Sequence, residues 1–162
     1  MKGHETFLRA AARLAETHQN VKFVCVGGGP QEYASRLEKL AHSLGLGQRI
    51  IWAGPRSDMP AVLNPLDIAS SFGEGVTNAV AEAMVCERPC VVIDVGDSAR
   101  IVGALGEVVP PRDPDALAAA MARMLDRIVR DPDLGRQARA RIVDEFSVEC
   151  MMLRTEQELA RH

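Results

Sequence analysis

The sequence lacks the marks of several protein classes. No apolar run approaches the roughly 18 residues that a bilayer span needs, and the N-terminus, MKGHETFLRA, is polar where a secretory signal is apolar. There is no basic excess, because 19 Lys and Arg against 22 Asp and Glu give a net charge of −3. Nucleic-acid binders usually carry a basic excess or stripe. These absences predict a cytoplasmic protein with no membrane span and no nucleic-acid partner.

The cysteines form no recognisable framework. Cys25, Cys86, Cys90 and Cys150 make neither a CxxC pair nor a dense disulfide pattern, and no His–Cys cluster completes a zinc site. No Ser-His-Asp arrangement can be assembled. We therefore expect reduced thiols, no metal site and no hydrolase chemistry.

What the sequence contains is an alternation of strand-like and helix-like segments. With 162 residues, 47% of them hydrophobic, the chain is the size of one domain, 1–162. The apolar runs are near-continuous, which is typical of parallel strands covered on both faces. They are Val21–Val26, Arg49–Ala53, Asp67–Ser71, Cys90–Asp94 and Gly106–Pro110. Helical apolar spacing between them predicts an α/β fold, a Rossmann-like parallel sheet with helices on both faces.

The C-terminal part reads as helices alone. From about residue 113 to 162 no strand signal occurs, and Ser147 stands where an N-cap would open a final helix. We expect these helices to form an extension of the single domain.

The first segment that could bind a ligand is the glycine run after the first predicted strand. Gly27, Gly28 and Gly29 stand at a strand-to-helix turn, where backbone amides can approach an anion. The dinucleotide fingerprint fails, because Glu32 stands where its third glycine belongs. A tight turn without a ligand remains the alternative interpretation.

The second segment is Ser70–Met84, a strand, a glycine-bearing loop and a helix that begins near Asn78. The loop after Gly75 would present free amides at a helix start, which suits a phosphate. Glu74 and Glu82 flank it, and their carboxylates would accept hydrogen bonds from sugar or ribose hydroxyls. The alternative is that both glutamates are solvated charges.

The third segment is the Lys2–Gly3 pair before an amphipathic helix. A cation at a helix start opposes the helix dipole, so an anionic ligand would explain it. A frayed terminus would explain it equally well.

The order of these segments is more specific than any one of them. KGHETFLRAAARLA, FVCVGGGP, IIWAGPRSDMPAVLNPLDIASS, GEGVTNAVAEAM and PCVVIDVG together resemble the C-terminal, donor-binding domain of the glycosyltransferase family 4 (group 1) enzymes. Those are retaining enzymes that use nucleotide sugars and have the two-domain GT-B fold. The resemblance implies a hexosyltransferase-type activity, a nucleoside diphosphate sugar as donor substrate and no metal cofactor.

The resemblance also implies roles for individual residues. Lys2 would contact the donor diphosphate and Glu74 the sugar hydroxyls, as the catalytic pair. Glu82 would hold the ribose. The remaining donor-binding residues would be the glycines Gly28, Gly29 and Gly75, Arg56 in the base-contacting segment, and the amides of Val76, Thr77 and Asn78.

The chain also departs from the family pattern. In the family, the sheet's first strand and an N-terminal acceptor-binding domain come before the Lys–Gly pair, so we expect both to lie outside these residues and any membrane contact to come through that N-terminal half. We therefore expect an exposed or borrowed strand edge between Val21–Val26 and Asp67–Ser71. Val76 stands where the family commonly has phenylalanine, and Glu87 where it commonly has glycine, so two turns are altered.

Together these features predict the donor-binding half of a retaining glycosyltransferase, inactive without an acceptor domain. Two alternatives stay open. One is a non-catalytic nucleotide- or partner-binding module on the same scaffold, and the other is a nicotinamide-dependent oxidoreductase, which the failed fingerprint disfavours.

Overall fold

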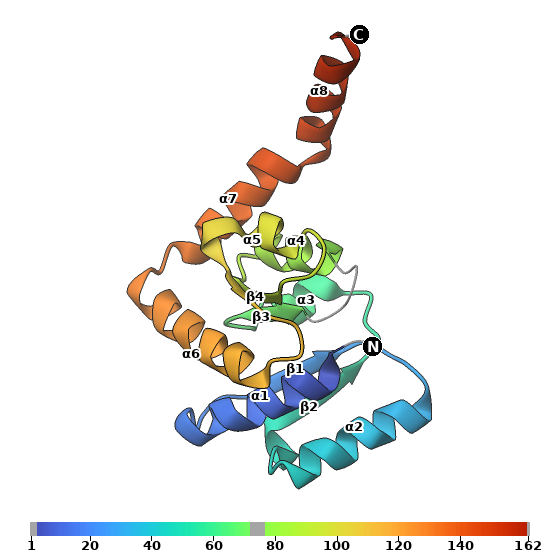
Figure 1. Cartoon of the computed structure of the whole chain (residues 1–162), viewed down its shortest axis with the longest axis vertical. Helices are drawn as coiled ribbons and strands as arrows, with labels where there is room; N and C mark the ends of the chain where they lie inside the picture. The colour runs from blue at the N-terminus through green and yellow to red at the C-terminus, as the bar shows by residue number, and fades with distance from the viewer. Residues whose placement is uncertain (1–2, 72–76, 162) are drawn as a thin grey trace.

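The computed structural model describes residues 3–71 and 77–161 and contains the five predicted strands. They are β1 (Phe23–Val26), β2 (Ile50–Gly54), β3 (Ala69–Ser71), β4 (Cys90–Ile93) and β5 (Glu107–Val109). β1 pairs with β2 in one sheet, and β3, β4 and β5 form a second sheet in that order (Figure 1). Each pairing is parallel, which confirms the predicted α/β class.

Helices connect the strands and follow the last one. They are α1 (His4–Thr17), α2 (Gln31–Ser43), α3 (Met59–Leu63), α4 (Thr77–Val85), α5 (Ser98–Val102), α6 (Pro114–Arg130), α7 (Leu134–Phe146) and α8 (Val148–Leu159), with short 3₁₀ turns at Gly47–Arg49 and Gly103–Leu105. After Val109 the described chain is helical, as predicted. The Ser147 hydroxyl accepts a hydrogen bond from the Cys150 amide at 3.2 Å, which confirms the expected N-cap.

The core lies on both faces of the three-stranded sheet, and β4 shows why. Successive side chains of a strand point to opposite faces. Val91 and Ile93 therefore pack into a cluster with α1 and α6, whereas Cys90 and Val92 pack into a second cluster with α4, α5 and α7. The prediction of helices on both faces is confirmed here.

The β1–β2 sheet is covered less completely. Phe23 and Ile50 join the cluster beneath α1 and α2. Ile51 and Trp52 on β2 are 48% and 38% exposed, and no β1 or β2 residue belongs to the second cluster. The expectation that every strand is covered on both faces is therefore wrong for β2, because the helices of the second cluster lie over the other sheet.

The two sheets do not join within the described chain. β1 pairs only with β2, and β3 pairs only with β4, so each has one edge without a strand partner. This confirms the predicted interruption between Val21–Val26 and Asp67–Ser71.

The last helix stands apart from the core. α8 extends away from the rest of the molecule (Figure 1), and its Val148, Met151 and Met152 side chains are exposed.

One of the two turns that depart from the family pattern has an unusual backbone conformation. At the turn after α4, Glu87 adopts a φ of 62°, the left-handed conformation that favours glycine. Among the described residues, none of the helices has both the length and the apolar character needed to cross a membrane.

Candidate functional site

Two loops meet at the carboxyl ends of β1 and β2. The amide of Gly27 donates a hydrogen bond to the carbonyl oxygen of Gly54 at 2.9 Å. A Cβ on Gly28 would lie 3.6 Å from Cγ of Pro55, an ordinary van der Waals contact. Gly27 and Gly54 have φ values of +131° and +65°, which residues other than glycine rarely adopt. The glycines therefore hold two neighbouring loops at one edge of the sheet.

Gly29 is open to solvent at this edge. A Cβ built there would meet nothing within 4 Å, and its φ lies outside the positive range. The fold itself therefore does not require glycine at position 29. A ligand that approached the backbone closely at this position would require it.

Arg56 follows Gly54 and Pro55 and is held by an ion pair. Its Nε donates to Oδ1 of Asp58 at 2.7 Å, and a second guanidinium nitrogen donates to Oδ2. The guanidinium lowers the pKa of Asp58 through this hydrogen bond and its charge. The i,i+2 spacing of an arginine and an aspartate across a turn is the sequence signal that indicates this pair.

The helix α4 supplies the other side of the candidate site. It begins at Thr77, and Asn78 is exposed in its first turn. Glu82 is also exposed, one turn further along the same face, whereas Val80, Ala83 and Met84 are buried on the opposite face. α4 thus presents one amide and one carboxylate side chain to solvent near its start.

Four predicted site residues lie outside the described part of the chain: Lys2, Glu74, Gly75 and Val76. The remaining predicted residues all follow the carboxyl ends of parallel strands. Gly28, Gly29 and Arg56 follow the strands of one sheet, and Thr77, Asn78 and Glu82 follow β3 of the other. Ligands of open α/β sheets bind at this edge, where the strand order reverses.

A cavity that no sequence motif indicates lies at the same edge. It has a volume of about 430 Å³ and is lined by Gly3 and His4 at the start of α1, Ile93 and Val95 at the end of β4, and Arg112 after β5, among others. Its wall is built from segments far apart in the sequence, which is why no motif indicated it.

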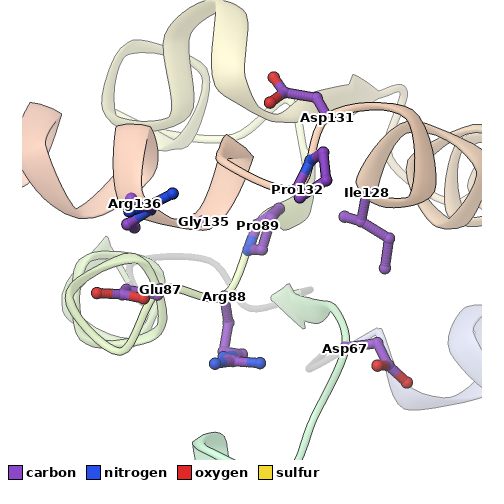
Figure 2. Close-up of a pocket in the computed structure, with 9 residues that line it drawn as sticks. All are labelled: Asp67, Glu87, Arg88, Pro89, Ile128, Asp131, Pro132, Gly135 and Arg136. Atoms are coloured by element: carbon purple, nitrogen blue, oxygen red, sulfur yellow. The ribbon is translucent and has the colours of Figure 1, made fainter.

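A second cavity, of about 230 Å³, lies at the opposite ends of the strands (Figure 2). Asp67 precedes β3 and Pro89 precedes β4, so this is the amino edge. The Arg88 side chain in its wall already donates to the carbonyl oxygens of Leu66 and Cys86, at 2.8 and 2.9 Å. We assign this cavity to the packing of the turns, because open α/β sheets take ligands at the other edge.

The described part of the chain holds free, mostly buried or half-buried thiols and no cluster of metal-binding side chains. All four cysteines are free, and burial raises the pKa of Cys25 to about 11 and that of Cys90 to about 12. These two thiols therefore stay protonated at neutral pH. Residues 3–71 and 77–161 contain no group of three or more His, Cys, Asp or Glu side chains that could hold a metal ion.

This arrangement is that of the group 1 glycosyltransferases, and the chain belongs to that family. The family model described as glycosyl transferases group 1 matches residues 1–127. The chain is 34% identical to the alpha-D-kanosaminyltransferase of Streptomyces kanamyceticus over 139 residues, 82% of this chain and 34% of the relative. It is 30% identical to the 2-deoxystreptamine glucosyltransferase of the same organism, over 91% of this chain and 39% of the relative. The chain therefore spans little more than a third of these curated relatives.

Solved structures agree on the fold. Anabaena HepE in complex with UDP superimposes with a TM-score of 0.85 at 22% identity, over 99% of this chain and 46% of that one. A glycosyltransferase from Rickettsia africae gives a TM-score of 0.81 at 23% identity, covering 98% of this chain and 43% of that one. The fold is thus part of a GT-B glycosyltransferase.

Proposed function

We propose that residues 1–162 form one domain, the donor-binding half of a retaining glycosyltransferase that transfers a sugar from a nucleoside diphosphate sugar. One observation carries the proposal. The two glycine loops after β1 and β2 and the start of α4 after β3 all stand at the carboxyl edge of parallel strands. The extension from about residue 113 completes this domain with helices.

The phosphates of the donor are assigned to the start of α4. The amides of Thr77 and Asn78 belong to the first turn of this helix, where amide groups have no helical partner and the dipole favours an anion. Gly75 and Val76 come directly before them in the sequence and would extend the same cluster of amides.

The nucleoside is assigned to the opposite loops and to the exposed face of α4. Glu82 accepts hydrogen bonds from the ribose hydroxyls, which a carboxylate does well. Gly28 and Gly29 let the backbone approach the ligand, and Arg56 lies beside the base. The pairing of Arg56 with Asp58 supports this role, because it fixes a flat guanidinium at the loop.

Catalysis is assigned to Lys2 and Glu74, by their match to the family motifs. Charge develops on a phosphate oxygen as the diphosphate leaves, and a lysine with helix-start amides stabilises that charge without a metal ion. Glu74 holds the hydroxyls of the sugar. The acceptor attacks from the face that the leaving group vacates, so the configuration is retained and no protein nucleophile takes part.

The rest of the machinery is assigned to a second domain. The acceptor, and any membrane surface that carries it, would be bound by an N-terminal domain outside these residues. The relatives are two to three times longer than the aligned part, which supports this division. Four free cysteines fit a reducing, cytoplasmic setting.

Calorimetric titration with UDP, GDP and ADP tests the proposal. UDP is the first ligand to try, since HepE was solved with UDP and with UDP-glucose. The variant Glu82→Gln should keep its thermal stability and lose roughly 1.5–3 kcal/mol of binding free energy, about one charge-assisted hydrogen bond. Glu38→Gln, the same substitution at an exposed position on α2, is the matched control. Unchanged affinity in Glu82→Gln would remove the ribose assignment.

Sugar transfer after mixing with a separately made N-terminal half tests the catalytic part. Transfer from the mixture, and none from either half alone, is the expected result. Nucleotide binding without transfer would instead indicate a non-catalytic module.

A further inference from the structure

We propose that Tyr33 is a positioning residue of the donor site and that it acts through Lys2. Together with Arg36, Tyr33 holds the first turn of α1 against the start of α2. It thereby fixes the Lys2–Gly3 pair relative to the glycine loop that precedes α2. This role rests on the proposed function, which has Lys2 contact the donor diphosphate.

Three contacts join the starts of the two helices. The rings of His4 and Tyr33 meet edge to face, with their centroids 6.0 Å apart and an angle of 75° between their planes. Arg36 forms an ion pair with Glu5, and its guanidinium carbon lies 5.7 Å from the centroid of the Tyr33 ring. Aromatic pairs, and cations over aromatic rings, attract each other at such separations. The first two residues of α1 are therefore joined to α2 by both of its side chains.

The start of α1 needs support from outside the helix. Gly3 stands at the N-cap position and has no side chain that could accept a hydrogen bond from the amides of the first turn. The cavity of about 430 Å³ is lined by Gly3 and His4 and also by Ile93 and Val95 at the end of β4, so the sheet does not pack tightly against this turn. Because uncapped helix ends fray, the contacts with α2 stabilise this turn.

Both helix starts come directly after segments assigned to the donor. Lys2 and Gly3 immediately precede α1, and Gly28 and Gly29 lie just before α2. If the first turn of α1 were free to fray, Lys2 would be distributed over many positions, and its attraction for the diphosphate would fall. A fixed contact between the two helix starts limits the distance between the lysine and the glycine loop, which bind the same nucleotide in the proposed function.

A purely structural role for Tyr33 is the alternative. Tyr33 is half-buried and packs against the cluster beneath α1 and α2, so its truncation should destabilise the fold in either case. Leu40, two turns later on α2, is also half-buried and packs against the same cluster. Leu40→Ala is therefore the matched control for Tyr33→Ala, because it removes an apolar contact from the same helix and leaves the helix starts intact.

The first measurement needs no ligand. The amide of Phe7 donates to the carbonyl oxygen of Gly3 at 3.0 Å and closes the first turn of α1, whereas the amide of His18 is bonded at the other end of that helix. We expect hydrogen exchange at Phe7, relative to that at His18, to be at least about fivefold faster in Tyr33→Ala than in Leu40→Ala. NMR measures both amides in one sample. Equal relative rates in the two variants would overturn the proposal, whether or not a nucleotide binds.

The second measurement separates the binding of the phosphates from the binding of the nucleoside. Titration with UDP and with uridine gives two dissociation constants, and their ratio reports what the diphosphate contributes. Lys2→Met should lower this contribution about tenfold or more, since a hydrogen bond to a charged group is lost. Tyr33→Ala should lower it at least about fivefold, and Leu40→Ala less than about twofold. Tyr33→Phe keeps the ring and should restore the contribution.

The outcomes distinguish this role from the proposed function. If Lys2→Met lowers the diphosphate contribution but Tyr33→Ala and Leu40→Ala give equal values, the positioning role is wrong and the donor site stands. If Lys2→Met leaves the contribution unchanged, Lys2 is removed from the proposed function and the positioning role falls with it.

A double variant tests whether Tyr33 acts through Lys2. Tyr33→Ala should add less than about twofold to the loss caused by Lys2→Met, because both substitutions weaken the same contact. Losses that multiply fully would show that Tyr33 reaches the nucleotide by another route, and would overturn the proposal.

Discussion

Gly135, in the first turn of α7, lies directly against the carbonyl oxygen of Glu87 in the turn that follows α4. A Cβ on Gly135 would stand 2.4 Å from that oxygen and 3.2 Å from the carbonyl carbon, both backbone atoms that cannot turn aside. The absent side chain therefore sets how closely α7 approaches the end of α4, and it places Ala138 and Ile142 of α7 in the second cluster.

The first prediction is that Gly135→Ala destabilises the fold. A methyl group at this position forces α7 away from the turn, and overpacking of this kind costs about 1–3 kcal/mol. Urea unfolding measures the loss. Gly47→Ala is the control, because a Cβ there meets nothing within 4 Å, and it should change the stability by less than about 1 kcal/mol. Equal free energies of unfolding in Gly135→Ala and Gly47→Ala would contradict the close approach of Gly135 to the backbone of Glu87.

The second prediction is that Glu87→Gly stabilises the protein. The left-handed conformation costs a residue with a Cβ roughly 1–2 kcal/mol in the folded state, and glycine avoids this cost. Glycine also loses more conformational entropy on folding, so the free energy of unfolding should rise by a net amount of about 0.5–1 kcal/mol. Glu87→Ala removes the charge and keeps the Cβ, so it should not reproduce the gain. A similar gain in the alanine variant would mean that charge, and not backbone conformation, limits stability at this turn.

The third prediction separates binding from folding at the glycine loop. In urea unfolding, Gly29→Ala should have the same free energy of unfolding as the parent to within about 0.5 kcal/mol, because nothing lies near the added methyl group. UDP affinity should fall at least about tenfold, because the methyl group occupies the space through which the backbone approaches the ligand. Parent-like UDP affinity in a folded Gly29→Ala protein would remove this loop from the site.

The fourth prediction concerns alkaline pH. Burial raises the pKa of Cys90 from an ordinary 9.0 to about 12, so the folded protein keeps a proton that the unfolded chain releases. Stability is therefore unaffected by this group below pH 9 and falls above it, by up to about 1.4 kcal/mol per pH unit. Urea unfolding between pH 8 and about 10.5 should show a shallower decline in Cys90→Ala than in the parent. Cys150→Ala, in α8, is the control for the loss of a thiol. If the free energy of unfolding falls with pH as little in Cys150→Ala as in Cys90→Ala, burial of Cys90 is not the cause.

The sequence predicts this fold well where local patterns decide the outcome. The apolar runs are bounded by glycine, proline or charge, so all five strands could be located within two residues at each end. Ser147 precedes an apolar helical stretch, and it caps α8 as expected. The interruption between β1 and β3 followed from the family resemblance, because the family's first strand has no counterpart in this sequence and the first strand of a doubly wound sheet is usually central.

Other features depend on tertiary contacts that no local pattern contains. The contact of Gly135 with Glu87 exists only once α7 packs on α4. The exposure of Trp52 was missed because an apolar run looks the same whether one or both of its faces are covered. The cavity beside Gly3 is invisible to motifs, because it is assembled from the start of α1, the end of β4 and the turn after β5.

Trp52 is the single tryptophan of the chain, and it stands 38% exposed on β2 in the sheet that is covered less completely. Its fluorescence therefore reports on the two-stranded sheet, whereas the far-UV circular dichroism comes mostly from helices packed around the other one. The two signals act as separate probes of two parts of one chain. If the smaller sheet opens first, the fluorescence transition will come at a lower denaturant concentration than the dichroism transition, and unfolding will not be two-state.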